Sequence, residues 1–568
     1  PSEPTLVGQQ QEPTEGGVRV KTRAQPVGTL SLKSGGCQVN VIYVTNNKHI
    51  DNKYKKPYIS NSRELVRENT MTNLKRFYGR ENEIQLLQKL KEDVCVRGVS
   101  RFVAISGRWR IGKTRLINEA FPTDSEVPTI SMYVASQLAS TNLSNLVDEI
   151  QSALGMPYRP ALRSYEEAFR LIFKEAERKP LILVLDEFQN FQSVDPTVFK
   201  TLQVLWDRHQ SKSKILVVVS GSENGLREIF ENEKAPLFEK ANEFIHLEPF
   251  SPKILKDVLM DFKNEFKGED LLALYSLTGG VPQYVQSFLE SGSLTLDAML
   301  KQSLSFNSGL MTEAQLIIAN EFKGNASHMN EILMAIALGK NKRRELVPAF
   351  DINISGHLHQ LENELGLIRQ IEPWGNNGAV RKRARFELTD NLLNFWYTFC
   401  LPNRKMLQSA SANELYDLIK VSYSVWLEGM LKRLYRHHFE KLGYFDEVSP
   451  WWDKSGESEI DLVAVNKSEK RIVFADIKFD ADDIDLKALK TKAINFFSLN
   501  QDYLSYQQEY LGLSVKELAS TGELPQIDCA TYSSLEDGYR DMAADRQYNR
   551  EANEWIKISG ETLKDESL

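Results

Sequence analysis

The chain contains 568 residues, which exceeds the roughly 250 to 300 residues at which a single hydrophobic core stops growing, so we expect several domains. Its 42% of hydrophobic and 26% of charged residues exclude disorder throughout, and its net charge of −7 excludes a uniformly basic nucleic-acid coat. The apolar runs are far shorter than the roughly 18 residues that cross a bilayer, and the four cysteines form no CxxC pair. We therefore expect a cytoplasmic protein without a membrane span, a zinc site or a disulfide framework.

The first segment, residues 1–70, is rich in Gly, Pro, Gln, Ser and Asn and contains one short apolar run at residues 41–44. This composition predicts a poorly ordered extension. Globular patterning starts just after Met71, so we expect Met71 to be the natural start of the protein.

The next segment, residues 71–250, alternates helical stretches with short runs rich in β-branched residues. These runs lie at residues 101–106, 129–134, 181–185, 215–220 and 244–247. Such alternation predicts an α/β domain built on a parallel sheet.

A phosphate-binding loop follows the first of these strands. Its sequence fits G-x-x-x-x-G-K-[ST] in full and precedes an amphipathic helix. The glycines let backbone N–H groups surround phosphates, Lys113 reaches the β and γ oxygens, and Thr114 offers a hydroxyl to Mg²⁺. We therefore expect ATP with Mg²⁺ as the cofactor, and we include Arg115 in the nucleotide-binding set. The motif consists of Gly107, Arg108, Trp109, Arg110, Ile111, Gly112, Lys113 and Thr114.

Two carboxylates, Asp186 and Glu187, end the apolar strand at residues 181–185. Asp186 is the candidate Mg²⁺ ligand, and Glu187 is the candidate base that orients and deprotonates the attacking water. The alternative is a solvated strand end without a catalytic role. The phosphate-binding loop favours the catalytic interpretation.

Further candidate contacts to the nucleotide come from two turns. Ser222 follows the strand at residues 215–220 and is placed to sense the γ-phosphate. Pro282 belongs to a Gly-Gly-Val-Pro turn that would bring a helical lid, residues 251–310, over the base. An ordinary helix end followed by proline explains that turn equally well.

Residues 311–400 contain two helical faces followed by a hairpin around a Gly/Asn-rich turn, an order that suggests a winged helix and a linker. Two basic clusters lie in this segment. Each is interpreted either as a contact to phosphates or as a solvated loop. The linker aromatics, residues 395–397, are interpreted as packing, with a partner surface as the alternative. The clusters are Lys340, Lys342, Arg343 and Arg344, and Arg381, Lys382, Arg383 and Arg385.

The segment that contains these motifs resembles the archaeal-type ATPase family of the AAA+/STAND P-loop group. The resemblance rests on residues 77–81 (Phe-Tyr-Gly-Arg-Glu), the phosphate-binding loop, the Asp186-Glu187 strand and the Gly-Gly-x-Pro turn at residues 279–282. It implies an additional-strand ATPase core, a helical lid and often a winged helix. Where relatives tend to carry Gly-Arg after Pro-Leu-aromatic, this chain has Glu239-Lys240, so Lys240 and Arg227 are the candidate fingers and turnover is expected to be slow.

The C-terminal segment, residues 401–535, is expected to be an α/β domain, followed by an acidic helical tail at residues 536–568. Its strand and hairpin partner would place Asp461 beside Asp476 and Lys478, an arrangement that resembles PD-(D/E)xK nucleases of the restriction-endonuclease type. Glu428 on the preceding helix is the expected additional acid. The carboxylates would hold Mg²⁺ and Lys478 would activate water, or the acids are relics of a domain that only binds.

These observations leave competing functions open. We prefer an ATP-binding protein and ATPase whose nucleotide state controls a nucleic-acid-binding winged helix and a nuclease-like domain. The alternative is a STAND-type signalling switch or scaffold with a protein partner and a non-cutting C-terminal domain. A ring-forming motor would need a trans-acting arginine that the sequence does not identify, and the oligomeric state stays open.

Overall fold

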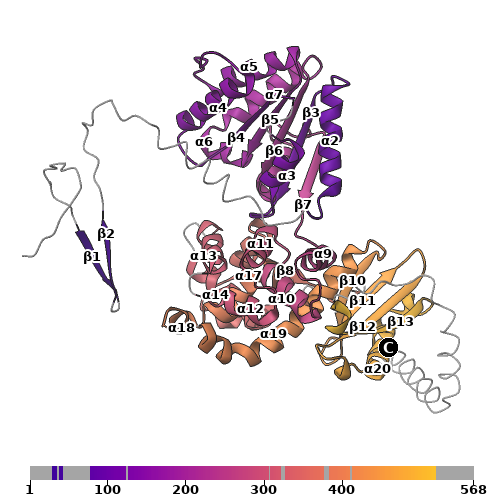
Figure 1. The fold of residues 1–568 in the computed structure, drawn as a ribbon. Helices are drawn as coiled ribbons and strands as arrows, with labels where there is room; N and C mark the ends of the chain where they lie inside the picture. Colours follow the sequence, from indigo (N-terminus) through magenta and orange to yellow (C-terminus); the bar gives the residue numbers. More distant parts are fainter. Residues whose placement is uncertain are drawn as a thin grey trace, which may run out of the picture. The chain divides into compact units, whose positions relative to one another are not determined.

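The computed structural model describes residues 77–122, 126–305, 308–321, 326–375, 383–409 and 412–519, together with two strands nearer the N-terminus (Figure 1). The two strands, β1 (Thr29–Ser34) and β2 (Cys37–Ile42), pair antiparallel. The chain divides into two units, Pro1–Met71 and Thr72–Leu568. Apart from β1 and β2, the predicted extension lies outside the described residues, as does the predicted acidic tail.

A five-stranded sheet in the order β4-β5-β6-β3-β7 forms the first domain of the second unit, and all of its neighbouring strands are parallel. The two strands β5 and β6 are buried along their whole length, which explains their continuous apolar sequences. The five strands predicted from the sequence are all confirmed. They are β3 (Arg101–Gly107), β4 (Thr129–Tyr133), β5 (Leu181–Asp186), β6 (Ile215–Gly221) and β7 (Glu243–Leu247).

Helices cover both faces of this sheet (Figure 1). Alternate residues of each strand face opposite sides. Val103 and Ile105 therefore pack with α2 and α3, whereas Phe102 and Ala104 pack with α4, α5, α7 and α8. The helices are α2 (Glu81–Cys95), α3 (Lys113–Ala120), α4 (Ala139–Leu154), α5 (Tyr165–Arg178), α6 (Phe191–Val194), α7 (Thr197–His209) and α8 (Glu223–Phe230), with a short helix η2 (Phe188–Asn190).

A helical region follows the sheet where the lid was predicted. Capping fixes the start of two of its helices, since Ser251 and Thr295 each accept a backbone N–H from the first turn. The helices are α9 (Pro252–Phe262), α10 (Gly268–Thr278), α11 (Pro282–Ser291), α12 (Leu296–Ser303) and α13 (Gly309–Glu321).

The hairpin unit comes next and has the predicted order of helices followed by two strands. A bridge between Lys342 and Arg385 adds a third extended segment beside the hairpin. The additional one-turn helix α15 was not predicted. The elements are α14 (Ala326–Ala337), α15 (Arg343–Leu346), η3 (Val347–Ala349), α16 (Ser355–His359), η4 (Gln360–Glu364), β8 (Ile368–Ile371) and β9 (Arg385–Leu388).

The C-terminal region begins with helices and ends in a four-stranded sheet of order β10-β11-β12-β13. Strands β10 to β12 are antiparallel, and β13 is parallel to β12 because α20 connects them. No helix in the described part of the chain, the 30-residue α19 included, is both long and apolar enough to cross a membrane. The elements are α17 (Asn391–Phe395), η6 (Trp396–Cys400), α18 (Arg404–Ser409), α19 (Ala412–Lys441), β10 (Glu447–Trp452), β11 (Glu459–Asn466), β12 (Arg471–Ile477), η7 (Ala481–Asp483), α20 (Leu486–Leu499), η8 (Gln501–Tyr503), β13 (Gln507–Leu513) and η9 (Lys516–Leu518).

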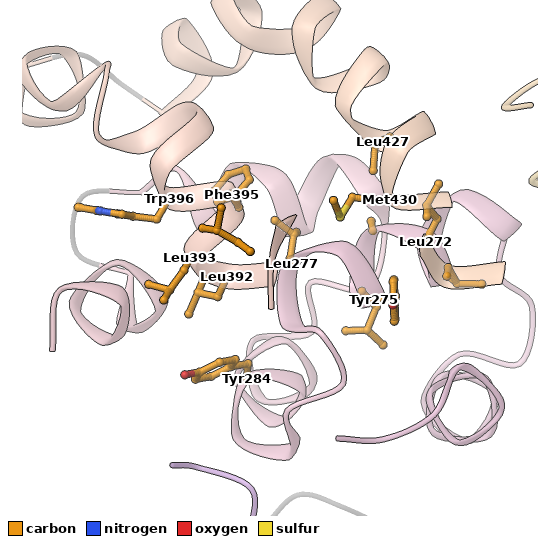
Figure 2. Packing of buried hydrophobic residues seen from close by; sticks show 14 of the residues in the cluster. Leu272, Tyr275, Leu277, Tyr284, Leu392, Leu393, Phe395, Trp396, Leu427 and Met430 are labelled. Carbon is orange, nitrogen blue, oxygen red and sulfur yellow. The ribbon is translucent and has the colours of Figure 1, made fainter. Parts of the chain in front are cut away.

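One hydrophobic cluster continues from the helical region through the hairpin unit into one face of the C-terminal sheet. Figure 2 shows part of it, where Leu277 of α10, Phe395 of α17 and Met430 of α19 lie close together. The linker aromatics at residues 395–397 are buried in this cluster, which supports their interpretation as packing. Helix α19 packs on α10 and α12 as well as on β10 and β11, so the C-terminal sheet is built onto the helical region.

Gly268 tests this continuity, because it lies where α10 meets the end of the C-terminal region. A Cβ atom at this position would lie 1.9 Å from the carbonyl oxygen of Val515. We expect Gly268→Ala to destabilise the protein by about 1 to 3 kcal/mol, measured as a lower Tm, because the backbone must shift. Gly356→Ala in α16 meets no atom within 4 Å and should change stability by less than about 0.5 kcal/mol. Equal shifts for both variants would contradict the tight packing of Val515 on α10.

Candidate functional site

The predicted phosphate-binding loop connects β3 to α3 at the carboxyl edge of the parallel sheet. Gly112 has a φ of 94°, a backbone conformation that residues other than glycine rarely adopt. A Cβ atom on Gly107 would lie 3.0 Å from the Leu247 carbonyl oxygen, so this position also needs glycine. Ile111 is buried in the core against the sheet. The loop is therefore held in a shape that exposes backbone N–H groups ahead of the α3 N-terminus.

Lys113 is buried and turned into the loop. Its Nζ donates to the carbonyl oxygens of Gly107, at 3.0 Å, and Arg108, at 3.3 Å, and it lies 3.9 Å from Glu187 Oε1. Burial lowers the pKa of Lys113, and Glu187 and Asp186 oppose that shift. The amine thus lies within the loop that would receive phosphates.

The two predicted acids lie beside this lysine at the end of β5. Asp186 accepts a 2.5 Å hydrogen bond from the Thr114 hydroxyl on one oxygen and a hydrogen bond from the Ser220 hydroxyl on the other. Glu187 accepts from Gln189 Nε2 at 2.7 Å. A hydroxyl and a carboxylate in direct contact are the donor pair that Mg²⁺ takes in P-loop sites, so these residues fit Mg²⁺ with a nucleotide.

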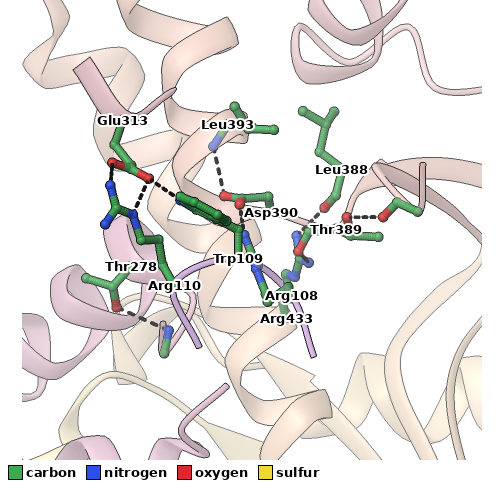
Figure 3. Close-up of polar contacts among 12 residues, drawn as sticks. Arg108, Trp109, Arg110, Thr278, Glu313, Leu388, Thr389, Asp390, Leu393 and Arg433 are labelled. Carbon is green, nitrogen blue, oxygen red and sulfur yellow. Dashed lines mark hydrogen bonds and ion pairs between the residues drawn. The ribbon is translucent and has the colours of Figure 1, made fainter. Parts of the chain in front are cut away.

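The side chains at the variable positions of the loop contact residues far along the chain (Figure 3). Arg108 forms an ion pair with Asp390, the N-cap of α17. Trp109 Nε1 donates to Glu313 Oε1 at 3.2 Å, and Arg110 holds both oxygens of Glu313 at 2.8 and 3.0 Å. We call these five residues the P-loop contact network. The sequence prediction treated Arg108, Trp109 and Arg110 only as nucleotide-binding positions and missed these partners.

The acidic members of the P-loop contact network are well buried. The Asp390 side chain is 4% exposed and that of Glu313 is 11% exposed. Burial lowers the pKa of Arg108 and Asp390 raises it. The net shift is upward, so the guanidinium stays charged. Removing either arginine would leave a buried carboxylate without its counter-charge.

A second cluster of charged residues lies where the nuclease-like site was predicted. Asp461 on β11 accepts from the backbone N–H of Ile477 on β12 at 2.9 Å, one residue beyond Asp476. On the preceding helix, Glu428 lies 3.9 Å from Lys478 Nζ. The structure therefore brings the predicted residues Glu428, Asp461, Asp476 and Lys478 to one end of the sheet.

Lys432 also belongs to this cluster and was not predicted. Its Nζ lies 2.9 Å from Asp461 Oδ1 and 3.4 Å from Glu428 Oε1. Burial lowers the pKa of Lys432, but Asp461 and Glu428 raise it more, so it is a cation here. In hindsight, its position one turn after Glu428 on α19 was the only local signal.

The cluster does not fit a preformed metal site. Asp461 already uses one oxygen for Lys432 and the other for a backbone N–H, and Asp476 accepts from the Asp485 backbone at 3.0 Å. Among the residues that the structure describes, no group of three His, Cys, Asp or Glu side chains is placed to hold a metal ion. We therefore assign no metal-dependent step to this arrangement.

Two known protein families match the chain, one over the part with the phosphate-binding loop and one over the part with the C-terminal charged cluster. Residues 77–288 match a family described as an ATPase domain predominantly from Archaea. The chain contains an archaeal-type ATPase domain. Residues 396–494 match a family of archaeal and bacterial proteins of unknown function. The archaeal-type ATPase domain therefore ends within the helical region, and the second match includes α19 and the charged cluster.

Similar proteins are found in archaea. An uncharacterized protein of Methanocaldococcus jannaschii is 25% identical over 427 residues, which are 73% of this chain and 90% of that protein. Among solved structures, the Walker-type ATPase of Pyrococcus abyssi is 17% identical, with a TM-score of 0.42, over 56% of this chain and 96% of that chain. The Aeropyrum pernix ORC2 protein, in ADPNP and ADP complexes, is 14% identical, with a TM-score of 0.39, over 62% of this chain and 97% of that chain.

Three other predicted nucleotide contacts of the archaeal-type ATPase domain have local structural roles. Ser222 caps α8 by accepting from the Gly225 N–H at 3.3 Å. The guanidinium of Arg115 lies 5.3 Å from the centre of the Phe77 ring. Pro282 is at the start of α11. The polar group at the end of β6 that reaches Asp186 is Ser220, which the sequence prediction did not select.

The two candidate fingers of the archaeal-type ATPase domain take part in surface ion pairs. Arg227 lies 3.1 Å from Glu223 and 3.8 Å from Glu231 on α8. Lys240 lies 2.7 Å from Asp207 on α7. The assignment of either residue as a finger stays a prediction.

A partly buried charged cluster lies next to the P-loop contact network. Glu387 on β9 pairs with Arg369 and lies 4.0 Å from Arg433 and 3.8 Å from Arg436. Burial would raise the pKa of Glu387, but Arg433, Arg369 and Arg436 lower it to about 2. Arg433 also donates to the carbonyl oxygens of Leu388 and Thr389, both at 2.7 Å. Helix α19 is thereby tied to the segment that leads into Asp390.

Proposed function

We propose that this protein is an ATP-hydrolysing switch whose nucleotide state controls a nucleic-acid-binding winged helix and a nuclease-like domain. The observation that carries the proposal is the P-loop contact network. Side chains of the phosphate-binding loop itself hold Glu313 and Asp390, which belong to the parts that the switch would control.

The residues at the carboxyl end of the parallel sheet would have distinct roles in ATP hydrolysis. Lys113 would bind the β and γ oxygens, and Glu187 would orient the attacking water and accept its proton. Thr114 and Asp186 would hold Mg²⁺, which neutralises phosphate charge when bound. Catalysis of this kind depends on positioning and charge stabilisation, which a rigid loop and strand end provide.

Nucleotide binding would act on the P-loop contact network through charge. Phosphates bring several negative charges to a loop whose arginines are paired with Asp390 and Glu313. Lys113 must also exchange its hydrogen bonds to Gly107 and Arg108 for phosphate oxygens. The loop therefore has two competing sets of acidic partners, and this competition would transmit the nucleotide state.

Features of the hairpin unit support its interpretation as a winged helix. Helices α14 to α16 precede the β8–β9 hairpin, and the Lys342–Arg385 bridge extends it. Lys340 and Arg344 are exposed, so both side chains are accessible to the phosphates of a nucleic acid. Arg385 instead pairs with Glu459 and lies over the Trp452 ring at 4.1 Å, so it joins the hairpin to the C-terminal sheet. Arg381 and Lys382 lie outside the described residues.

The element order of the C-terminal region supports a nuclease-like domain. A helix, an antiparallel three-stranded sheet, a crossover helix and a parallel fourth strand follow one another, with the predicted acids on α19, β11 and β12. The second candidate function, a signalling switch with a protein partner, is favoured by the Lys432–Asp461 ion pair, because that pair makes the site unsuited to cutting.

The experiment is to measure binding of fluorescent DNA and RNA at fixed salt without nucleotide, with ADP and with Mg·ATP. We expect the affinity of the wild type to change at least about fivefold between nucleotide states, the usual size of a coupling. Lys113→Ala should remove this dependence. Asp390→Asn should shift the nucleotide-free affinity toward the ATP value, because it weakens the P-loop contact network.

The matched control is Asp207→Asn, which removes the partner of Lys240 and leaves the P-loop contact network intact. It should behave as wild type. Nucleic-acid binding that is equal in all nucleotide states would contradict the switch. If no form binds nucleic acid, the protein-partner function is supported instead. Cleavage, where it occurs, should be lost in Asp476→Ala; cleavage that persists would refute the nuclease assignment.

A further inference from the structure

The charged cluster of the C-terminal region contains an ammonium group at the position where two acids would share a cation. We propose that Lys432 is a tethered cation that occupies the place of a divalent metal between Asp461 and Glu428 and keeps metal out of this site. The inference rests on the nuclease-like fold that the proposed function gives to this domain. It makes Lys432 the residue that decides whether the site takes a metal.

The geometry of Lys432 supports this role. Its Nζ lies 2.9 Å from Asp461 Oδ1 and 3.4 Å from Glu428 Oε1, so a single group contacts both carboxylates. The Lys432 side chain is 26% exposed and that of Asp461 is 15% exposed. A metal that bridged the same two oxygens would have to displace the ammonium, because both ions need the same space and the same lone pairs.

The other contacts of Asp461 and Asp476 leave few carboxylate lone pairs for a metal ion. The second oxygen of Asp461 accepts the Ile477 N–H, and Asp476 accepts the Asp485 N–H. Lys478 adds a second positive charge 3.9 Å from Glu428. The two carboxylates of Glu428 and Asp461 thus face two ammonium groups, and the net negative charge that would attract a divalent ion to them is small.

The position of Lys432 is fixed by its helix. Leu431 and Leu434 on either side are fully buried in the hydrophobic cluster. Arg433 is held by the carbonyl oxygens of Leu388 and Thr389. Since α19 is anchored on both neighbours of Lys432, the ammonium cannot leave the acids by a small movement of the backbone.

The test is titration of the nucleotide-free, full-length protein with Mn²⁺ by isothermal calorimetry. We expect weak binding by the wild type and at least about tenfold tighter binding by Lys432→Met, because two neighbouring carboxylates lose their resident cation. Lys432→Gln should also bind more tightly. The gain should vanish in the double variant Lys432→Met with Asp461→Asn, which identifies the site.

Two charge controls accompany these variants. Lys432→Arg keeps the positive charge and should not gain affinity, and Lys420→Met removes an exposed lysine that lies 5.7 Å from the Tyr416 ring on the same helix. Circular dichroism would confirm that each variant is folded. Tight, Asp461-dependent Mn²⁺ binding by the wild type, or unchanged binding in both folded Lys432→Met and Lys432→Gln, would overturn the inference. Either result leaves the nucleotide dependence of nucleic-acid binding untouched, so the proposed function fails or stands on its own experiment.

Discussion

Replacing Glu187 with glutamine is expected to lower kcat for ATP hydrolysis by roughly 10²-fold to 10⁴-fold, the usual contribution of a general base. The substitution keeps the shape of the side chain and its contact with Gln189, but removes the group that accepts the proton of water. ATP affinity should change only a few-fold, because the loop, Lys113 and Thr114 are unchanged. Single-turnover hydrolysis and nucleotide-binding titrations would separate the two effects.

The control for this variant is Glu223→Gln. Glu223 is partly exposed on α8 and pairs with Arg227 at 3.1 Å. Its substitution should leave kcat within about twofold of the wild type, as expected for a surface pair. A Glu187→Gln enzyme with normal kcat would move the base to another group, and equal losses in both variants would indicate a general electrostatic effect.

Replacing Glu387 with glutamine is expected to destabilise the protein by about 1 to 3 kcal/mol at neutral pH. The variant leaves the mostly buried Arg433 and Arg436 and the half-exposed Arg369 without their shared counter-charge, and solvent around Arg369 makes the cost smaller than that of breaking a fully buried pair. The midpoint of thermal unfolding should fall accordingly. Glu447→Gln, which breaks an exposed pair with Lys467 at 3.9 Å, should change stability by less than about 1 kcal/mol.

The effect of Glu387→Gln should also depend on pH. The folded-state pKa of Glu387 is lowered to about 2 from an ordinary value of 4.5. A carboxyl group with a lowered pKa contributes stability above its unfolded pKa and loses it as pH falls toward the folded pKa. The difference between wild type and variant should therefore be full at pH 6 to 7 and shrink between about pH 4.5 and 2. A difference that is independent of pH would show that the arginines do not depend on the charge of Glu387.

The parallel sheet was predictable from the sequence because its information is local. Strands β5 and β6 are continuous apolar runs, and the spacing of Gly107, Gly112 and Lys113 defines the phosphate-binding loop within eight residues. The carboxylates at residues 186 and 187 follow directly from the end of β5. Periodicity and motif spacing act over a few residues, so one sequence is enough to read them.

The contacts that would make the protein a switch were not predictable in this way. Arg108 meets Asp390 across 282 residues, and Arg110 meets Glu313 across 203. Nothing near either acid distinguishes it from a solvated residue. Lys432 was missed for a related reason, since a lysine one turn from a glutamate is common on helix surfaces, and only the folded sheet brings Asp461 to it. The winged-helix and nuclease interpretations stay predictions.

The hydrophobic cluster shared by α10, α19 and the C-terminal sheet has a consequence for how this protein could have evolved. A lineage that lost the C-terminal sheet would expose the apolar side of α19 and part of α10 to water, which favours aggregation. A recombination event that exchanged the sheet for another module would face the same mismatch. Selection would therefore keep the archaeal-type ATPase domain and the segment of unknown function together, inherited as one piece rather than as interchangeable parts.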